Sequence, residues 1–153
     1  LLEAGKIDAF FLPHPPHSVA TGETKARHLF VDSKAEEQAY YTKHGDFPIM
    51  HIVAMHQDLA DEMPELGKAL IETFNGARDL AEGYYEDPNW SRLAWGRHLY
   101  EEERVAFNGN PWRNGFLKNR ENIARFIKYS HDQGLIDELF EPETLFIPNT
   151  LDS

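Results

Sequence analysis

Cysteine is absent from this chain of 153 residues, and its absence removes several kinds of chemistry. Without thiols there are no disulfide bonds, no thiolate zinc site and no cysteine nucleophile. Long apolar runs are absent as well, since none approaches the ~20 residues that a membrane-spanning helix requires. The sequence therefore predicts a protein without a disulfide framework and without membrane insertion.

Positive charge is scarce, with 15 Lys and Arg against 26 Asp and Glu and a formal net charge of −11. The acidic residues are scattered along the chain, which indicates a solvated surface. This balance argues against a general binder of nucleic acid or anionic membranes, because nothing would neutralise the phosphates. An anionic ligand would need a local basic pocket. The composition, 41% hydrophobic and 27% charged, is typical of a globular domain with one core.

Several catalytic signatures are also missing: G-x-S-x-G, the P-loop, G-x-G-x-x-G and H-E-x-x-H. The sequence opens with LLEAGKIDAFF, without an initiator Met or a signal peptide. This opening resembles the end of a helix that runs into a strand. We therefore expect the chain to begin in the middle of a fold.

Apolar periodicity and helix-end residues predict strands at the front of the chain and helices behind. Ser33 and Glu36 fit a capping box with Ser33 as the N-cap, Pro64 fits the first turn of a helix, and Gly134 fits a helix end. A helical or irregular connection is expected over Pro88–Trp95. The expected strands are 7–12, 27–31 and 48–56, and the expected helices are 34–44, 64–85, 98–107 and 117–133. This order predicts an α/β fold from which part of the sheet is missing.

Gly45–His56, with the sequence GDFPIMHIVAMH, is the most apolar run. A short run of this kind between Gly and Pro is typical of a strand that is covered on both faces. Its one polar side chain within the apolar part, His51, is either a hydrogen-bonded core histidine or a residue that holds an anionic or hydroxylated ligand.

His14 and His17 form H-x-x-H in a proline-rich turn after the first expected strand. Ligands bind at the carboxyl ends of strands in open α/β folds, so both are candidate site residues. A divalent metal would need a third ligand from His28, His51 or Asp32. Two histidines in a loop are weak evidence for a metal, so we predict no metal and no cofactor. The simplest alternative is a pair of exposed loop residues.

Arg27, His28 and Tyr41 complete the candidate binding residues. Arg27 could hold a carboxylate through two parallel hydrogen bonds, although a lone Arg is more often part of a surface ion pair. Tyr41 either borders the core or places its hydroxyl against a ligand.

The blocks LLEAGKIDAFF, RHLFVD, AEEQAYYTKHGDFPIMHIVAM and FIKYSHDQGLIDELFEPETL, in this order and spacing, resemble the C-terminal half of the 4,5-dihydroxyphthalate decarboxylase family. The most specific parts are G-x-F-P-I-M-H and Y-x-x-x-Q-G-L-x-x-x-L-F. The resemblance extends over nearly the whole chain.

The resemblance implies a type-II periplasmic-binding-protein fold, with two α/β lobes and a ligand cleft between them. Residues 1–47 would belong to the second lobe. Residues 48–153 would form a crossover strand and helices that return to a first lobe, whose N-terminal part is absent. His51 would lie near the cleft.

The resemblance also implies an activity, the non-oxidative decarboxylation of a hydroxylated aromatic carboxylate by a cytoplasmic carboxy-lyase. His51 or His14 would be the general acid, Arg27 would hold a second carboxylate, and His17, His28 and Tyr41 would bind substrate. The partner would be a small aromatic carboxylate, and a homo-oligomer is compatible with this. The alternative is a periplasmic solute-binding protein of an ABC-type transporter, with the same cleft and no catalysis.

Overall fold

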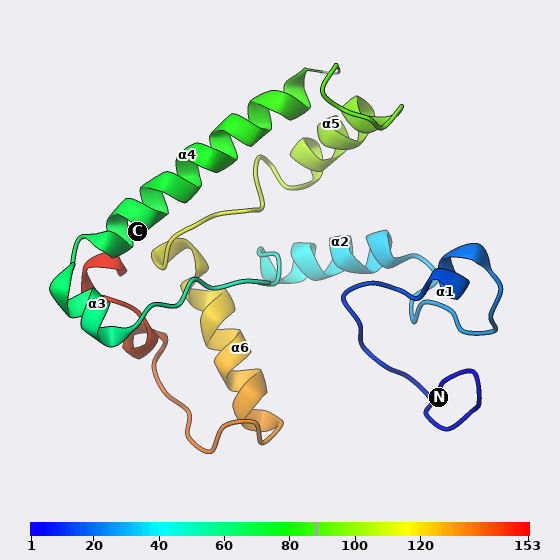
Figure 1. The fold of residues 1–153 in the computed structure, drawn as a ribbon, viewed down its shortest axis with the longest axis horizontal. Helices are drawn as coiled ribbons and strands as arrows, with labels where there is room; N and C mark the ends of the chain where they lie inside the picture. The colour runs from blue at the N-terminus through cyan, green and yellow to red at the C-terminus, as the bar shows by residue number, and fades with distance from the viewer. Residues whose placement is uncertain (88) are drawn as a thin grey trace. The chain divides into compact units, whose positions relative to one another are not determined.

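Residues 1–87 and 89–153 are described by the structure, a computed structural model, and they form helices and turns (Figure 1). They divide into two compact units, Leu1–Lys43 and His44–Ser153. Neither described range contains a β-strand. The predicted α/β class, and the two-lobed α/β fold that the resemblance implied, are therefore wrong. The predicted division into 1–47 and 48–153 stays a prediction.

The first unit contains two helices, α1 over His17–Thr21 and α2 over Ser33–His44. Helix α2 lies where it was expected, but its N-cap is Asp32 and not Ser33. The Asp32 Oδ1 accepts a hydrogen bond from the backbone N–H of Ala35 at 3.0 Å, which satisfies one of the free donors of the first turn. Gly45 follows the helix at φ 73°, a conformation that favours glycine.

The three expected strands are irregular or extended segments without a ladder. In the run 48–56 no backbone hydrogen bond joins residues 50–55 to another segment of the described chain. Met50 is 74% exposed and Ile52 is 60% exposed, although both faces were expected to be covered. The physical reason is that strand formers specify a strand only where a neighbouring strand accepts their hydrogen bonds and covers their side chains.

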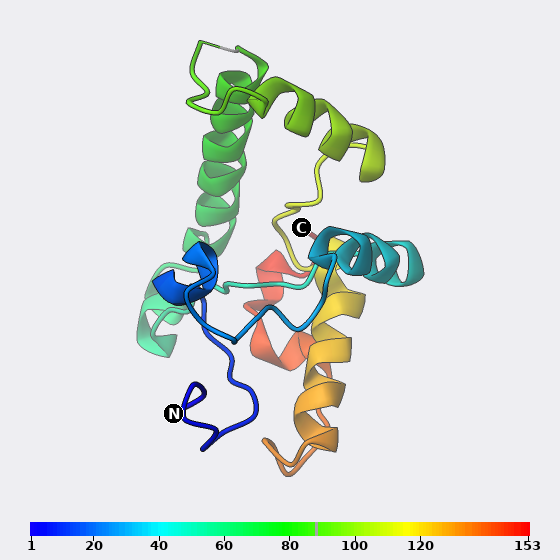
Figure 2. The same cartoon turned by 90° about the vertical axis from the view of Figure 1, so that its right-hand side faces the viewer.

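The second unit holds the remaining helices, and the three longest of them match the helices expected at 64–85, 98–107 and 117–133 to within a few residues (Figures 1 and 2). They are α3 Gln57–Glu62, α4 Leu66–Glu86, α5 Gly96–Ala106 and α6 Arg120–Asp132, with 3-10 turns η1 Leu117–Asn119, η2 Pro142–Leu145 and η3 Pro148–Thr150. Of the connection expected over Pro88–Trp95, Pro88 lies outside the described residues and 89–95 is irregular.

The core of the second unit surrounds one face of α6. Phe116, Ile123 and Ile127 are each about 95% buried. Partly buried apolar side chains pack against these three: Ile49, Ile136, Phe146 and Leu151. The start of the extended segment is tied to the same helix, because Asn122 Nδ2 donates to the Phe47 carbonyl at 2.6 Å. The C-terminal turns lie beside α6, as Figure 2 shows.

Apolar residues recur every three or four positions along α4, a spacing typical of a buried stripe, but this stripe is largely uncovered. Leu66 and Leu70 are half-buried, Phe74 is 48% exposed, and Ala77 and Ala81 are exposed. The buried residue of this helix is Gly67, which lies against η3.

A different face of α4 is covered by the loop between α5 and η1. Asn114 Nδ2 donates to Asn75 Oδ1 at 3.2 Å, and Arg78 Nη1 donates to the Trp112 carbonyl at 3.2 Å. Asn110 and Glu82 are also hydrogen-bonded. Positions 75, 78 and 82 share one face of the helix, so polar contacts fix this loop along α4.

Candidate functional site

A pocket of about 940 Å³ lies within the second unit. Its walls are formed by the extended run 49–55, helices α3 and α4, the loop 113–119 and the C-terminal turns 144–150, together with Ile123 of α6. Its volume is near the upper end of the ~300–1,000 Å³ that is usual for small-molecule sites. This pocket is the candidate functional site.

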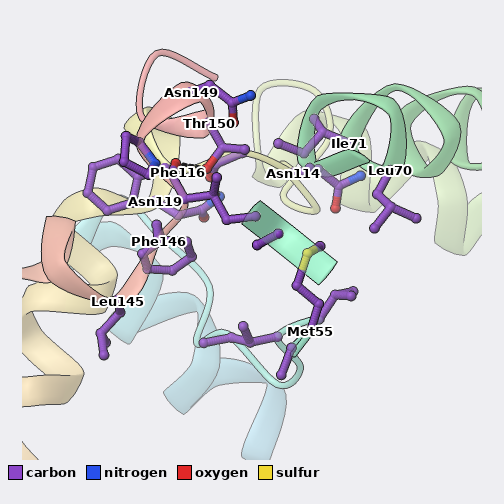
Figure 3. A pocket seen from close by; sticks show the side chains of 18 of the residues that line it. Met55, Leu70, Ile71, Asn114, Phe116, Asn119, Leu145, Phe146, Asn149 and Thr150 are labelled. Carbon is purple, nitrogen blue, oxygen red and sulfur yellow. Dashed lines mark hydrogen bonds between the residues drawn. The ribbon is translucent and has the colours of Figure 1, made fainter. Parts of the chain in front are cut away.

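Most of its wall is apolar. Met55, Leu70 and Ile71 lie on one side of the space, and Leu145 and Phe146 lie on another (Figure 3). The uncovered stripe of α4 thus contributes to a wall of the pocket. Such a lining suits a flat hydrophobic body, such as an aromatic ring, because the ring leaves water on binding.

The loop 113–119 is held rigidly by the last residue of η1. Asn119 Nδ2 donates to the carbonyl oxygens of Arg113 at 2.7 Å and Gly115 at 2.8 Å. The other side of the loop is tied to Ser153, whose Oγ accepts from the Phe116 N–H at 2.9 Å. Gly115 has φ 107°, and a Cβ there would lie 2.7 Å from the Ser153 carbonyl carbon. The sequence at this position therefore requires glycine.

Three ionisable side chains line the pocket: His51, Asp61 and Arg113. Asp61 Oδ1 accepts a hydrogen bond from Gln57 Nε2 at 2.9 Å. The His51 imidazole and the Arg113 guanidinium have no hydrogen-bond or ion-pair partner in the described part of the chain. The pocket thus combines an acceptor, a cationic donor and an imidazole in an otherwise mainly apolar wall.

Asn149 in η3 joins the pocket wall to the start of α4. Its Nδ2 donates to the Pro64 carbonyl at 2.5 Å, while its Oδ1 is buried without a partner among the described residues. Nearby, Arg120 Nε donates to Glu143 Oε1 at 2.6 Å. This hydrogen bond lowers the pKa of the Glu143 carboxyl and raises that of the Arg120 guanidinium. These contacts fix the C-terminal turns against α4 and α6.

Of the residues predicted from the sequence, His51 lines the pocket. The other five lie in the first unit: His14 in a bend, His17 at the start of α1, Arg27 and His28 in an irregular segment, and Tyr41 on α2. His51 belongs to the second unit, His44–Ser153. The convergence of His51 with these five residues therefore stays a prediction.

Two observations bear on the alternatives left open by the sequence. Arg27 Nη1 donates to the carbonyl oxygens of His28 at 3.0 Å and Leu29 at 3.1 Å, so part of its guanidinium stabilises its own turn. Among the residues described, no group of three or more His, Asp or Glu could hold a metal ion. The three-ligand alternative built on His14 and His17 therefore gains no support.

Sequence reasoning missed Arg113 and Asn119. Both lie in or just after the stretch NGNPWRNG, whose Gly, Asn and Pro residues are typical of a loop. The available signal was an Arg inside a Gly- and Asn-rich loop, because rigid loops often carry binding residues.

The chain is 28% identical to the 4,5-dihydroxyphthalate decarboxylase of Comamonas testosteroni over 155 aligned positions, which include the whole chain. It covers 47% of that protein, so it spans about half the length of the curated relative it matches. No family model matches the chain. The similarity confirms the resemblance inferred from the sequence blocks. In the part that the structure describes, no helix has the length and hydrophobicity needed to cross a bilayer.

Proposed function

We propose that this chain is part of an enzyme that decarboxylates a hydroxylated aromatic acid of the 4,5-dihydroxyphthalate type without oxidation. The observation that carries the proposal is the similarity, over the whole chain, to a protein named as the decarboxylase of that acid. The pocket supports it, because its apolar wall suits a ring and Arg113 and His51 suit an anion.

The chemistry needs a proton donor and a water-poor site. A ring hydroxyl ortho or para to the carboxylate-bearing carbon makes that carbon basic enough to take a proton. The bond from the ring to the carboxylate then breaks, CO₂ leaves, and the electron pair of that bond restores the aromatic ring. The balance is one proton gained and one CO₂ lost, so no oxidant and no organic cofactor is needed. An apolar wall favours this step, because water would stabilise the charged carboxylate of the bound substrate more than the neutral CO₂ that leaves.

His51 is the proposed general acid. In its protonated form the imidazole gives a proton to the ring carbon and takes another from water afterwards. His14 is the alternative general acid. The proposed substrate-binding residues in the first unit are Arg27, His17, His28 and Tyr41. A small aromatic carboxylate is the proposed partner, and the enzyme is proposed to be cytoplasmic.

The direct test uses the protein that contains this chain at its full natural length. We expect CO₂ release from 4,5-dihydroxyphthalate, measured together with the change in aromatic absorbance. His51→Gln should lower kcat by about 10²- to 10⁴-fold, the usual contribution of a general acid. His56→Gln is a matched control, since His56 is exposed as His51 is but does not line the pocket. Binding of the acid without CO₂ release would reject the enzyme and favour a solute-binding protein.

A further inference from the structure

We propose that Arg113 holds, through its guanidinium, the carboxylate that the reaction leaves on the ring. This rests on the proposed function, in which one of two neighbouring carboxylates departs and the other remains. The remaining carboxylate is the group that a fixed cation can hold throughout, from the binding of the substrate to the release of the product.

The first argument is the availability of Arg113. Most other Lys and Arg side chains of the second unit have a carboxylate partner within the described residues: Lys68, Arg78, Arg97, Arg104, Arg120, Arg125 and Lys128. No partner is present for Arg92, Arg113 and Lys118 in that part of the chain. Of these three, only Arg113 lines the pocket. In a chain with a net charge of −11, a cation left unpaired at a pocket is a local attraction for an anion.

The second argument is the rigidity of its backbone. Asn119 uses both hydrogens of one amide to hold the carbonyl groups of Arg113 and Gly115, and Ser153 holds the next two backbone N–H groups. A guanidinium on a fixed backbone loses less conformational freedom when it binds a carboxylate. Asn119 is therefore a positioning residue that acts through Arg113.

The third argument is the distribution of charge along the wall. Asp61 is a carboxylate and would repel an acid, but it accepts hydrogen bonds from ring hydroxyls. Arg113 and Asp61 thus match the two kinds of group on a dihydroxy dicarboxylic ring, and the apolar side chains match its faces. A purely apolar ligand would leave Arg113 without a partner and Asp61 with Gln57 alone.

Phthalate, which has both carboxylates but no hydroxyl, is the probe for this proposal. It lacks the group that makes the ring carbon basic, so its affinity can be measured by calorimetry without turnover. Arg113→Gln in the full-length protein should weaken phthalate binding by about 10- to 100-fold, the usual effect of losing charge-assisted hydrogen bonds. Arg113→Lys should recover part of the affinity, because the charge returns without the planar fork.

Lys118→Gln is the matched control for net charge. Lys118 is exposed, lies five positions further along the chain and does not line the pocket. We expect phthalate affinity to change by less than about 2-fold in this variant, because Arg113 is exposed as well and differs from Lys118 in lining the pocket. If Arg113→Gln and Lys118→Gln weakened phthalate binding equally, the effect would come from the overall electrostatic field of the protein, and the proposal would be overturned.

The role of Asn119 is tested with Asn119→Leu, which keeps the approximate size, removes both donors and adds no charge to the pocket wall. We expect weaker phthalate binding in the parent protein and no further weakening when Arg113 is already Gln. The loss of stability, in contrast, should be the same in both backgrounds. Additive effects on affinity would show that Asn119 acts only on the fold, and would overturn its positioning role.

The two proposals fail in different ways. If the protein binds phthalate through Arg113 but releases no CO₂ from 4,5-dihydroxyphthalate, the enzyme is rejected and the Arg113 site is retained. If CO₂ is released and Arg113→Gln leaves both phthalate affinity and the KM for the dihydroxy acid unchanged, the Arg113 site is rejected and the enzyme is retained.

Discussion

Helices α4 and α6 both carry apolar side chains along one face, but they use that face differently. The 13 residues of α6 include four buried ones, Asn122, Ile123, Ile127 and Ser130. The 21 residues of α4 include one, Gly67. Helix α6 is covered by the C-terminal turns and by the start of the extended segment, whereas the uncovered stripe of α4 contributes to the pocket wall. The same amphipathic pattern thus stabilises the unit in one helix and forms a binding surface in the other.

The strongest test of this difference between α4 and α6 is to shorten one apolar side chain on each helix. Ile127→Ala removes a 96% buried side chain and should lower the free energy of unfolding of this unit by about 2–5 kcal/mol. Phe74→Ala removes a side chain that is 48% exposed and should cost clearly less. Urea unfolding followed by circular dichroism measures both. Equal losses would mean that the stripe of α4 is covered in solution.

The sequence predicted the helices well and the strands badly, and the difference is physical. A helix satisfies its hydrogen bonds within one segment, so Pro64, Gly45 and Gly134 located helix ends from local residues alone. A strand needs a neighbour, and the apolar run 48–56 does not specify one. Asp32 capped α2 in place of Ser33 because both are good N-caps and the pattern does not choose between adjacent residues.

The candidate site could be predicted only in part from the sequence, for the same reason. His51 was noticed because it interrupts an apolar run, which is a local signal. The local signal for Arg113, an Arg in a Gly- and Asn-rich loop, is weaker. Arg113 stands out clearly when the partners of the other cations are known, and several of those partners are far away in the sequence, as Asp46 is from Arg125. Their pairing therefore requires coordinates.

The glycines of α4 provide a smaller test within that helix. A Cβ at Gly67 would lie 2.8 Å from Thr150 Cγ2, so Gly67→Ala should destabilise the unit by about 1–3 kcal/mol through overpacking. Gly76 meets nothing within 4 Å, and Gly76→Ala should stabilise it by about 0.5–1 kcal/mol, because alanine loses less conformational entropy in a helix. Thermal unfolding of the two variants gives the sign of each change. Stabilisation by both would show that η3 does not pack on α4.

The smallest effect is expected at the ion pairs that hold α6. Arg120 at its first residue binds Glu143, and the hydrogen bond lowers the pKa of that carboxyl. Lys128 lowers the pKa of Asp132 at its last residue in the same way. A carboxyl whose pKa is lower in the folded state binds fewer protons there than in the unfolded chain. Its contribution to stability is therefore complete above its unfolded pKa, about 4.3 for Glu, and is lost as the pH falls through the folded value.

Glu143→Gln removes one of these two pairs and should flatten the acid limb of the stability profile. The variant should be slightly less stable than the parent at neutral pH, and the difference should shrink as the pH falls below the folded pKa of Glu143. Both carboxyls are exposed enough for salt to screen them, so ~1 M NaCl should reduce the difference as well. Glu72→Gln on α4 is the matched control, because Glu72 is exposed and forms no ion pair within the described residues. If both variants gave the same pH profile, the Arg120–Glu143 pair would contribute nothing to the stability of α6, and the contrast with α4 would rest on its apolar face and on the contacts of Asn122 and Arg125.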